Sequence, residues 1–156
     1  MQSRTHIDHA RLEDRPAIAH LLTACGLGAD VLDRQIGRWV VAREAGQIVG
    51  CGVLEVVGTS GLLRSIAVAA SRRRRSIGST LVSVLLDDAA ELGVTAVYAF
   101  TRDAAGFFRR LRWQPAHGTD AFSKLGIAPY ADTPVFCVSL VERTRLAVHG
   151  VRQKTA

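Results

Sequence analysis

The segment from Leu62 to Leu92 constrains the fold of this chain more than any other. In its first part, Leu62 to Val68, an extended strand would carry apolar residues on both faces, which favours a strand inside a sheet over an edge strand. The basic run Arg72 to Arg75 follows. Apolar residues then recur at the spacing of one helical face, at Ile77, Leu81, Val84, Leu85, Ala89 and Leu92. The segment thus predicts a buried strand, a basic loop and a long helix.

The junction between the basic loop and the helix is a predicted anion site. The first amides of a helix have no partner within it, and the helix dipole favours negative charge there. Gly78, between Ser76 and Ser79, would let a phosphate approach the backbone. We therefore expect a ligand that carries a pyrophosphate at Arg72 to Ser79. A solvated turn and a nonspecific nucleic-acid patch are the alternative interpretations of the four arginines.

The composition is that of a folded domain. The 156 residues are 48% hydrophobic and 22% charged, which suits one domain, residues 1–156, ending in a basic tail at 142–156. No apolar run approaches the roughly 18 residues of a membrane span, and the polar N-terminus lacks the apolar core of a signal peptide. We expect a cytoplasmic protein with no membrane partner.

The net charge of +6 points to an anionic partner. A small polyanion accounts for the cluster at 72–75 as simply as nucleic acid does. The chain has only two tryptophans, two tyrosines and five phenylalanines, most of them in apolar stretches, whereas nucleic-acid binders interleave basic and exposed aromatic residues. We therefore expect a small polyanion and not nucleic acid, and a nucleic-acid binder that uses Arg72 to Arg75 stays the last-ranked alternative.

The three cysteines, Cys25, Cys51 and Cys137, are far apart and lack the spacing of metal ligands. We expect reduced, buried thiols and no bound metal. Whether the three converge in space stays open.

Glu55 and Arg64 form the sharpest site prediction made from the residues themselves. A turn at 58–61 joins two predicted strands, and a regular hairpin would make these two residues cross-strand neighbours among apolar side chains. Burial would raise the pKa of Glu55, and Arg64 would lower it again. One interpretation is a simple ion pair. The other is a substrate site, in which Glu55 takes the proton of an amine and Arg64 holds an anionic group.

The remaining elements follow from periodicity and from turn signals. Asp14 and Asp103 are the expected caps of the helices that begin at Arg15 and Ala104. The expected helices span Arg15–Cys25, Ala29–Ile36, Ala104–Leu111 and, as a short one, Asp120–Leu125, and the expected strands span 3–10, Trp39–Glu44, Gln47–Val57, Val94–Thr101 and Val135–Val141.

Three stretches resemble the GNAT N-acetyltransferases. Residues 73–78, RRRSIG, are similar to the family's acetyl-coenzyme A loop, Arg/Gln-x-x-Gly-x-Gly/Ala, with Ser76 in place of the first glycine. ARLEDRPAIAHLL resembles the entry to the first helix, and AAGFFRRLRW resembles a late helix, with Arg112 where the family has glycine. The resemblance implies an α/β fold: a single-domain, mixed and mostly antiparallel sheet flanked by helices, with its fourth and fifth strands splayed apart.

The resemblance also implies a reaction, in which acetyl-coenzyme A donates its acetyl group to an amine by direct attack. Phe108 stands where many members have the tyrosine that protonates the departing thiolate, so that water, Ser65 or Tyr98 would have to serve instead. The predicted catalytic residues are Glu55 and Ser65, and Arg64 and Glu55 would bind the substrate. The residues predicted to bind the coenzyme are Ile66, Ala67, Val68, Arg73, Arg74, Arg75, Ser76, Ile77, Gly78, Ser79, Thr101 and Phe108.

The acceptor is predicted to be a small amine, because a base next to a cation suits a zwitterionic or anionic compound resembling an amino acid. GVLEVVGTSGLLRSIAV is similar to short GNAT proteins associated with arsenic resistance, which implies acceptors that contain arsenic or phosphorus. Two further functions remain open: a protein N-acetyltransferase, with 26–38 and 114–134 as walls of a groove, and a non-catalytic module that binds acetyl-coenzyme A. A homodimer also stays open.

Overall fold

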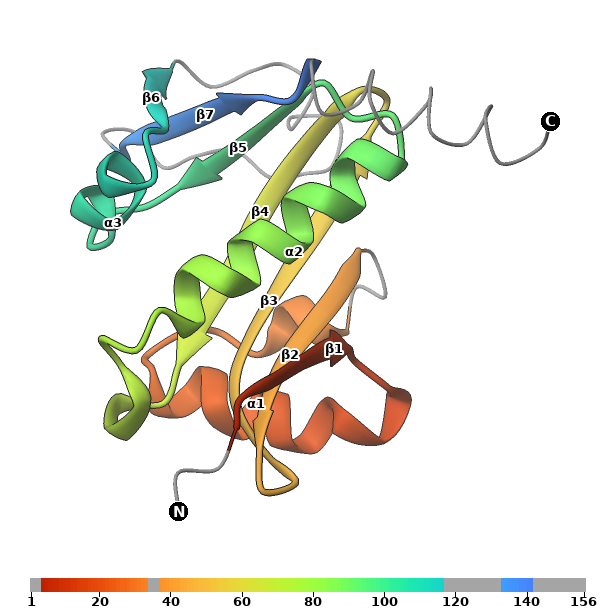
Figure 1. Cartoon of the computed structure of the whole chain (residues 1–156), viewed down its shortest axis with the longest axis vertical. Coiled ribbons are helices and arrows are strands. Elements are labelled where there is room, and N and C mark those ends of the chain that lie inside the picture. The colour runs from red at the N-terminus through yellow and green to blue at the C-terminus, as the bar shows by residue number, and fades with distance from the viewer. Residues whose placement is uncertain (1–3, 34–36, 117–132, 142–156) are drawn as a thin grey trace, which may run out of the picture. The chain divides into compact units, whose positions relative to one another are not determined.

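The structure, a computed structural model, describes residues 4–33, 37–116 and 133–141 (Figure 1). Its helices are α1 (Arg15–Ala24), α2 (Ile77–Glu91) and α3 (Ala105–Arg110), and its short 3₁₀ turns are η1 (Leu12–Asp14), η2 (Asp30–Leu32) and η3 (Ala70–Arg72). Its strands are β1 (His6–His9), β2 (Arg38–Glu44), β3 (Gln47–Val57), β4 (Ser60–Val68), β5 (Ala96–Phe100), β6 (Gln114–Ala116) and β7 (Val135–Ser139).

The described strands form one seven-stranded sheet in the order β1-β2-β3-β4-β5-β7-β6. β4 and β5 run parallel, whereas β1 with β2, β2 with β3, β5 with β7 and β6 with β7 are antiparallel. This confirms the expected mixed, mostly antiparallel α/β sheet flanked by helices. It also confirms that β4 lies inside the sheet, as its two apolar faces predicted.

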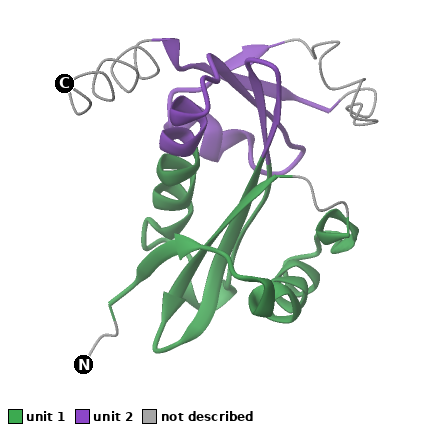
Figure 2. Ribbon diagram, turned by 90° about the vertical axis from the view of Figure 1, so that its right-hand side faces the viewer, with its two compact units in different colours: residues 1–54, 64–85 green, residues 55–63, 86–156 purple. Residues whose placement is uncertain are grey.

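The contacts within the chain divide it into two compact units (Figure 2). Unit 1 comprises residues 1–54 and 64–85, and unit 2 comprises residues 55–63 and 86–156.

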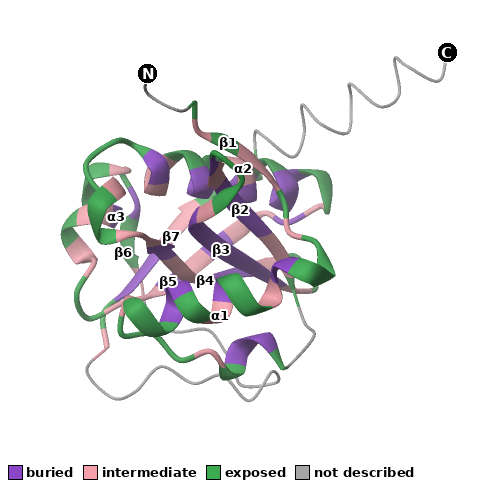
Figure 3. Cartoon of the chain, turned by 90° about the horizontal axis from the view of Figure 1, so that it is seen from below, coloured by how far each residue is buried: buried purple, intermediate pink, exposed green. Residues whose placement is uncertain are grey.

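In unit 1, α1 packs against one face of the strands. Pro16 lies in its first turn, where a missing amide hydrogen costs nothing. The helix buries Ile18, Leu21 and Leu22 in a cluster with side chains from β2, β3, β4 and η2. Those partners are Val31, Leu32, Val41, Cys51, Val53 and Ala67. Figure 3 shows that α1 has buried and exposed stretches along its length.

The opposite face of β3 carries α2, and two glycines allow its close approach. A Cβ atom at Gly50 would lie 3.0 Å from Leu81 Cδ1, and one at Gly52 would meet Ile66 as well as Leu85 Cδ1 at 3.1 Å. Since side chains alternate along a strand, Cys51 points to α1 while the glycines face α2. The two helices therefore cover opposite faces of these strands, as Figure 1 shows.

Unit 2 pairs β4 with β5 from Ser60↔Ala96 to Leu63↔Ala99 and continues through β7 to β6. α3 ends in a Schellman motif: the amide of Trp113 donates to the carbonyl of Phe108 at 3.0 Å, and that of Arg112 donates to Arg109 at 2.9 Å. Arg112 therefore has a φ of +63°, a conformation that glycine adopts without strain. The ring of Phe108 lies 4.9 Å from that of Trp113 and stacks on Phe136 at 5.9 Å.

Several expectations about local structure were wrong. Leu92 is 46% exposed and follows the end of α2, so it is not part of the buried stripe. Asp14 occupies the N-cap position of α1, but its side chain makes no cap hydrogen bond and binds Arg43 instead. Asp103 does not cap α3: the Thr101 hydroxyl accepts from the amide of Ala104 at 2.8 Å, because it lies three residues before that amide.

Other elements differ in extent from the prediction. The predicted helix at 29–36 is only the short turn η2 in the described residues, and β6 was not predicted. Ser60 and Gly61 belong to β4 and pair with β5, so the turn after β3 is shorter than expected. The helix predicted at 120–125, part of the groove wall at 114–134 and the basic tail at 142–156 lie outside the described residues.

Candidate functional site: the basic loop before α2

The strand that leads into the basic loop changes direction at Ser65. Its φ of +54° breaks the regular alternation of β4 two residues after the pairing with β5 at Leu63↔Ala99. The Ser65 carbonyl accepts a weak hydrogen bond from the buried thiol of Cys51 at 3.6 Å. Beyond it, Ile66 faces Gly52 and α2, whereas Ala67 is buried on the α1 side.

The loop is attached to unit 1 at its start. The amide of Ala69 donates to the carbonyl of Val49 at 2.8 Å, and η3 follows directly. Arg73 reaches back over this turn. Its Nε donates to the Val68 carbonyl at 3.1 Å, and its Nη2 donates to the thiol sulfur of Cys25 at 3.7 Å. The side chain of Arg73 thus holds the loop against the end of β4 and the end of α1.

A buried carboxylate holds the middle of the loop. Glu44, at the end of β2, is 5% exposed and accepts from Arg72 Nε at 2.6 Å. Its other oxygen accepts from the Thr5 hydroxyl at 2.7 Å and lies 3.6 Å from Arg75 Nη1. The hydrogen bonds from Thr5 and Arg72 lower the pKa of Glu44, so the carboxylate is charged at neutral pH.

Arg74 differs from its three neighbours. It is exposed, has a φ of +60°, and makes no hydrogen bond or ion pair with any residue that the structure describes. Ser76 also lies in the left-handed region, with a φ of +61°. The predicted site for a pyrophosphate is therefore a loop with two left-handed residues, three arginines that contact polar groups of unit 1, and one arginine that is available to a ligand.

α2 begins at Ile77, immediately after this loop. The carbonyl of Ser76 accepts from the Thr80 amide at 3.0 Å and from the hydroxyls of Thr80 at 2.7 Å and Ser79 at 3.0 Å. Ile77 is buried and anchors the first turn, whereas Gly78 is half-buried. The helix is long enough for its dipole to favour an anion at this end.

The other predicted site residues have defined local environments. Glu55, near the end of β3, is fully buried, and Arg64 and Ser65 on β4 are half-buried. Thr101 follows β5 and uses its hydroxyl at the start of α3, while Phe108 belongs to the aromatic cluster of unit 2. Burial raises the pKa of Tyr98, so its phenol is protonated at neutral pH. The pairing of Glu55 with Arg64 stays a prediction.

The sequence profile of the Acetyltransferase (GNAT) family matches residues 7–112, which include the α1 entry, the basic loop and α3. The chain belongs to the GNAT acetyltransferase family. Membership defines its class, that of the acetyl-CoA-dependent acetyltransferases, and the matched residues include the loop before α2.

Solved structures agree with this fold. Rv2747 from Mycobacterium tuberculosis, in complex with CoA and NLQ, is 25% identical over 86% of this chain and 99% of that one, with a TM-score of 0.73. N-acetylglutamate synthase from Neisseria gonorrhoeae, complexed with coenzyme A and L-arginine, is 19% identical with a TM-score of 0.75; the match covers 88% of this chain but only 34% of the synthase. The chain thus spans about a third of the synthase's length.

A third similar structure is an enzyme whose acceptor is a protein. The ribosomal-protein-S18-alanine N-acetyltransferase from Escherichia coli is 16% identical over 86% of this chain and 91% of that one, with a TM-score of 0.67. At such identities the likeness concerns the fold alone.

Unit 1 of this GNAT protein also contains a pocket of about 890 Å³, away from the basic loop in the chain. Part of the predicted wall at 26–38 lines it, together with the end of β1 and the start of α1. The lining residues are His9, Ala10, Arg11, Leu12, Arg15, Ile18, Leu32, Gly37, Arg38 and Trp39. The lining combines apolar side chains with three arginines, Arg11, Arg15 and Arg38.

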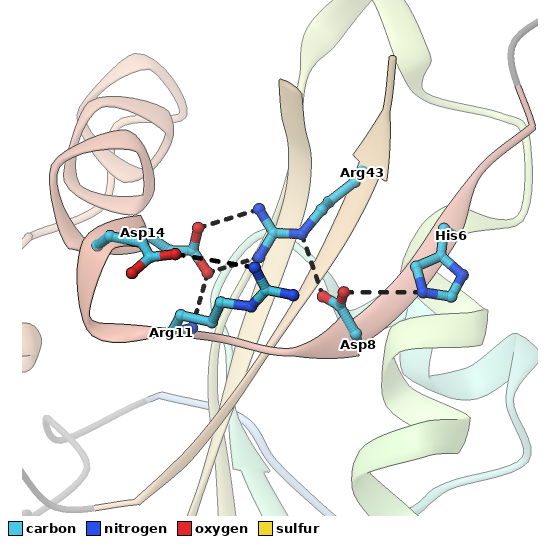
Figure 4. A network of polar contacts seen from close by, with 6 residues as sticks. His6, Asp8, Arg11, Asp14 and Arg43 are labelled. Atoms are coloured by element: carbon cyan, nitrogen blue, oxygen red, sulfur yellow. Dashed lines mark hydrogen bonds and ion pairs between the residues drawn. The ribbon is translucent and has the colours of Figure 1, made fainter. Parts of the chain in front are cut away.

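A polar network lies beside this pocket (Figure 4). Arg43 on β2 donates to both carboxylate oxygens of Asp14, at 2.6 and 3.0 Å, and to Asp8 at 3.2 Å. The Arg43 hydrogen bond lowers the pKa of Asp14, whose other contact is the amide of Arg11 at 2.7 Å. Asp14 and Glu44 are thus two buried carboxylates, each held by an arginine, of which only Glu44 touches the basic loop.

The sequence did not reveal Glu44, Thr5 or the pairing role of Arg72. Glu44 stands just before the Ala45–Gly46 turn, where an acidic residue is unremarkable, and its partners are 28 and 39 residues away. Only the register of the strands could have indicated these contacts.

The cysteines are free thiols: Cys51 is buried, and Cys25 and Cys137 are half-buried. Burial raises the pKa of Cys51 to about 12, which makes it inert at neutral pH. Among the described residues, no group of His, Cys, Asp and Glu could hold a metal ion. Within those residues, no helix has the length and apolar character to cross a membrane.

Proposed function

We propose that this GNAT protein transfers the acetyl group of acetyl-CoA to the amine of a small acceptor that resembles an amino acid. The observation that carries the proposal is the loop between β4 and α2. It combines the family's motif, left-handed backbone at Ser76, an exposed Arg74 and the unpaired amides of a long helix. These features suit the pyrophosphate of a coenzyme, with the pantetheine arm along Ile66 to Val68.

In the proposed reaction, the acceptor's neutral amine attacks the thioester carbonyl carbon. The carbon–sulfur bond breaks, coenzyme A leaves as a thiolate, and the nitrogen loses its second proton to water, which can pass it to the thiolate. Glu55 takes the proton that the ammonium must lose, directly or through water. Its complete burial supports this role, because a base at the reacting centre has to lie inside the site and out of bulk water. The amide of Val68 would donate to the thioester oxygen.

The thiolate needs no tyrosine for its departure. Phe108 is packed between aromatic rings and has no proton to donate. A thiol is acidic enough for its anion to leave near neutral pH, and water or Ser65 can protonate it afterwards. Catalysis would then consist mainly of positioning and of removing the ammonium proton.

An anionic or zwitterionic acceptor is supported by two features. Arg64 is half-buried on β4 beside Ser65, and three arginines, Arg11, Arg15 and Arg38, line the pocket of unit 1. Two similar N-acetylglutamate synthase structures contain L-arginine or N-acetyl-glutamate, which are amino-acid ligands of those proteins. Compounds that carry a phosphinate or an arsinate in addition to an amino acid group extend the same chemistry.

The first test is thermal unfolding with and without acetyl-CoA. A ligand at about 100 times its Kd stabilises the folded state by roughly 2.7 kcal/mol. We expect a clear rise in Tm, followed by release of free thiol when amino acids and their phosphinate or arsinate analogues are added. Coenzyme binding without turnover of any amine would favour a non-catalytic module, and turnover of peptides alone would favour a protein N-acetyltransferase.

The second test is Glu55→Gln, which keeps the shape of the side chain and removes its basicity. We expect kcat to fall by about 10²- to 10⁴-fold and the acidic limb of the pH–rate profile to disappear. Acetyl-CoA affinity should not change. An unaltered rate and pH profile would show that Glu55 is not the base.

A further inference from the structure

Glu44 divides the arginines of the coenzyme loop into two groups. Arg72 and Arg75 both face this carboxylate, at 2.6 and 3.6 Å, and are each 39% exposed. Arg73 is attached to the Val68 carbonyl and to Cys25. Among residues of the loop that the structure describes, Arg74 alone keeps a guanidinium with no polar partner.

A carboxylate near an anion site weakens the binding of phosphates, because like charges repel. Its presence beside this loop therefore calls for a structural role that offsets the repulsion. Glu44 is nearly buried, so its charge must be compensated by hydrogen bonds, and both of its oxygens are engaged. It receives one donor from Thr5, which precedes β1, and one from η3 of the loop. The carboxylate therefore ties the loop to the strands of unit 1.

We propose that Glu44 is a positioning residue for the coenzyme. By holding Arg72 and Arg75 inward, it fixes the backbone from η3 to Ser76, and so keeps Arg74 and the first amides of α2 in place for the pyrophosphate. Arg72 and Arg75 then act mainly on the loop, rather than as direct phosphate ligands. The inference rests on the proposed use of acetyl-CoA, but it concerns coenzyme binding and does not need an identified acceptor.

The decisive comparison uses two ligands and two matched variants. Acetyl-CoA carries the pyrophosphate, whereas S-acetylpantetheine has the same thioester arm without it. Glu44→Gln removes the negative charge that faces Arg72 and Arg75. Asp14→Asn removes the charge of an equally close carboxylate, 2.6 Å from Arg43, whose partners among the described residues are Arg11 and Arg43 and not the loop. Dissociation constants are measured by calorimetry for both ligands and both variants.

We expect Glu44→Gln to weaken acetyl-CoA binding about tenfold while S-acetylpantetheine binds as to the wild type. Asp14→Asn should lower Tm but leave both dissociation constants unchanged. Equal loss for both ligands would mean that Glu44 only stabilises the unit, and unchanged or tighter acetyl-CoA binding would overturn the positioning role. If the wild type itself binds no acetyl-CoA, the proposed function fails first.

A second variant covers the case in which Glu44→Gln does not fold. Arg72→Gln removes the other partner at a side chain that is 39% exposed, and it should weaken acetyl-CoA binding to a similar degree. Where both single variants fold, the double variant Glu44→Gln/Arg72→Gln should bind acetyl-CoA as well as either single variant does, because the two residues act through one contact. Additive losses would instead indicate that Arg72 binds phosphate directly.

Discussion

Two helix ends in this molecule adopt the same strained backbone conformation but are held by different forces. Ser76, before α2, has a φ of +61°, and Arg112, after α3, has a φ of +63°. The first lies in a loop tied down by charge, through Glu44 and Arg72. The second lies between aromatic rings, since Phe108 and Trp113 close the Schellman motif. The strength of an ion pair depends on pH and on a nearby anionic ligand, whereas the packing of aromatic rings depends on neither.

The largest effect is expected at the aromatic end. Phe108→Ala would remove a buried ring from its contacts with Phe107, Trp113 and Phe136, at a cost of about 3–5 kcal/mol. Urea unfolding measures this loss. Phe107→Ala, at a half-buried neighbouring ring, is the control and should cost less. Equal losses would mean that the cluster does not hold the helix end.

Acid should affect the charged end selectively. Hydrogen bonds lower the pKa of Glu44 below 4.5 and that of Asp14 below 3.8, so their stabilisation is complete above those values and is lost as pH falls through the lower folded pKa values. The chain has one tryptophan in each unit, Trp39 and Trp113. We expect the fluorescence of Trp39, in a Trp113→Phe variant, to change at a higher pH than that of Trp113 in Trp39→Phe. Coincident transitions would contradict the contrast.

Arg112→Gly tests the strain at the aromatic end. Glycine adopts a positive φ without the cost of about 1–2 kcal/mol that other residues bear, but it loses roughly 0.5–1 kcal/mol of chain entropy. We expect a net stabilisation of up to about 1 kcal/mol in urea unfolding. Arg112→Ala is the control, because it removes the side chain but keeps the strain, and it should bring no gain.

Ser76→Gly makes the same exchange at the charged end, where we expect the smallest change in global stability, under about 0.5 kcal/mol. A surface loop can open without unfolding the unit, so relief of its strain appears mainly in local opening. Amide hydrogen exchange at the start of α2 measures that opening and should slow down. A stabilisation equal to that of Arg112→Gly would mean that the loop unfolds together with its unit.

Much of the local structure was predictable. The bounds of β3, Gln47–Val57, agree with the structure, because a two-residue Ala45–Gly46 turn and a long apolar run define them. α1 and α3 agree to within one residue at each end. The predicted caps were wrong: the fold brings Arg43 to the Asp14 carboxylate, and the Thr101 hydroxyl, not Asp103, accepts from the amide of Ala104.

The candidate site was predictable only in part. The basic loop and the start of α2 follow from composition and helical periodicity, and they carry the family's motif. The roles of the individual arginines do not follow from the sequence, because nothing in a run of four identical residues tells which of them has a partner. The pairing of Glu55 with Arg64 remains a prediction that Glu55→Gln and substrate screening can test.

The sequence by itself determined the strand, loop and helix of the proposed coenzyme site, because those depend on neighbouring residues and on periodic burial. Only the tertiary structure decided which arginines are engaged. Glu44 and Arg72 are 28 residues apart and meet because the end of β2 lies beside η3. Such contacts depend on strand register, in which a shift of one residue turns each side chain to the other face. No local pattern records that register.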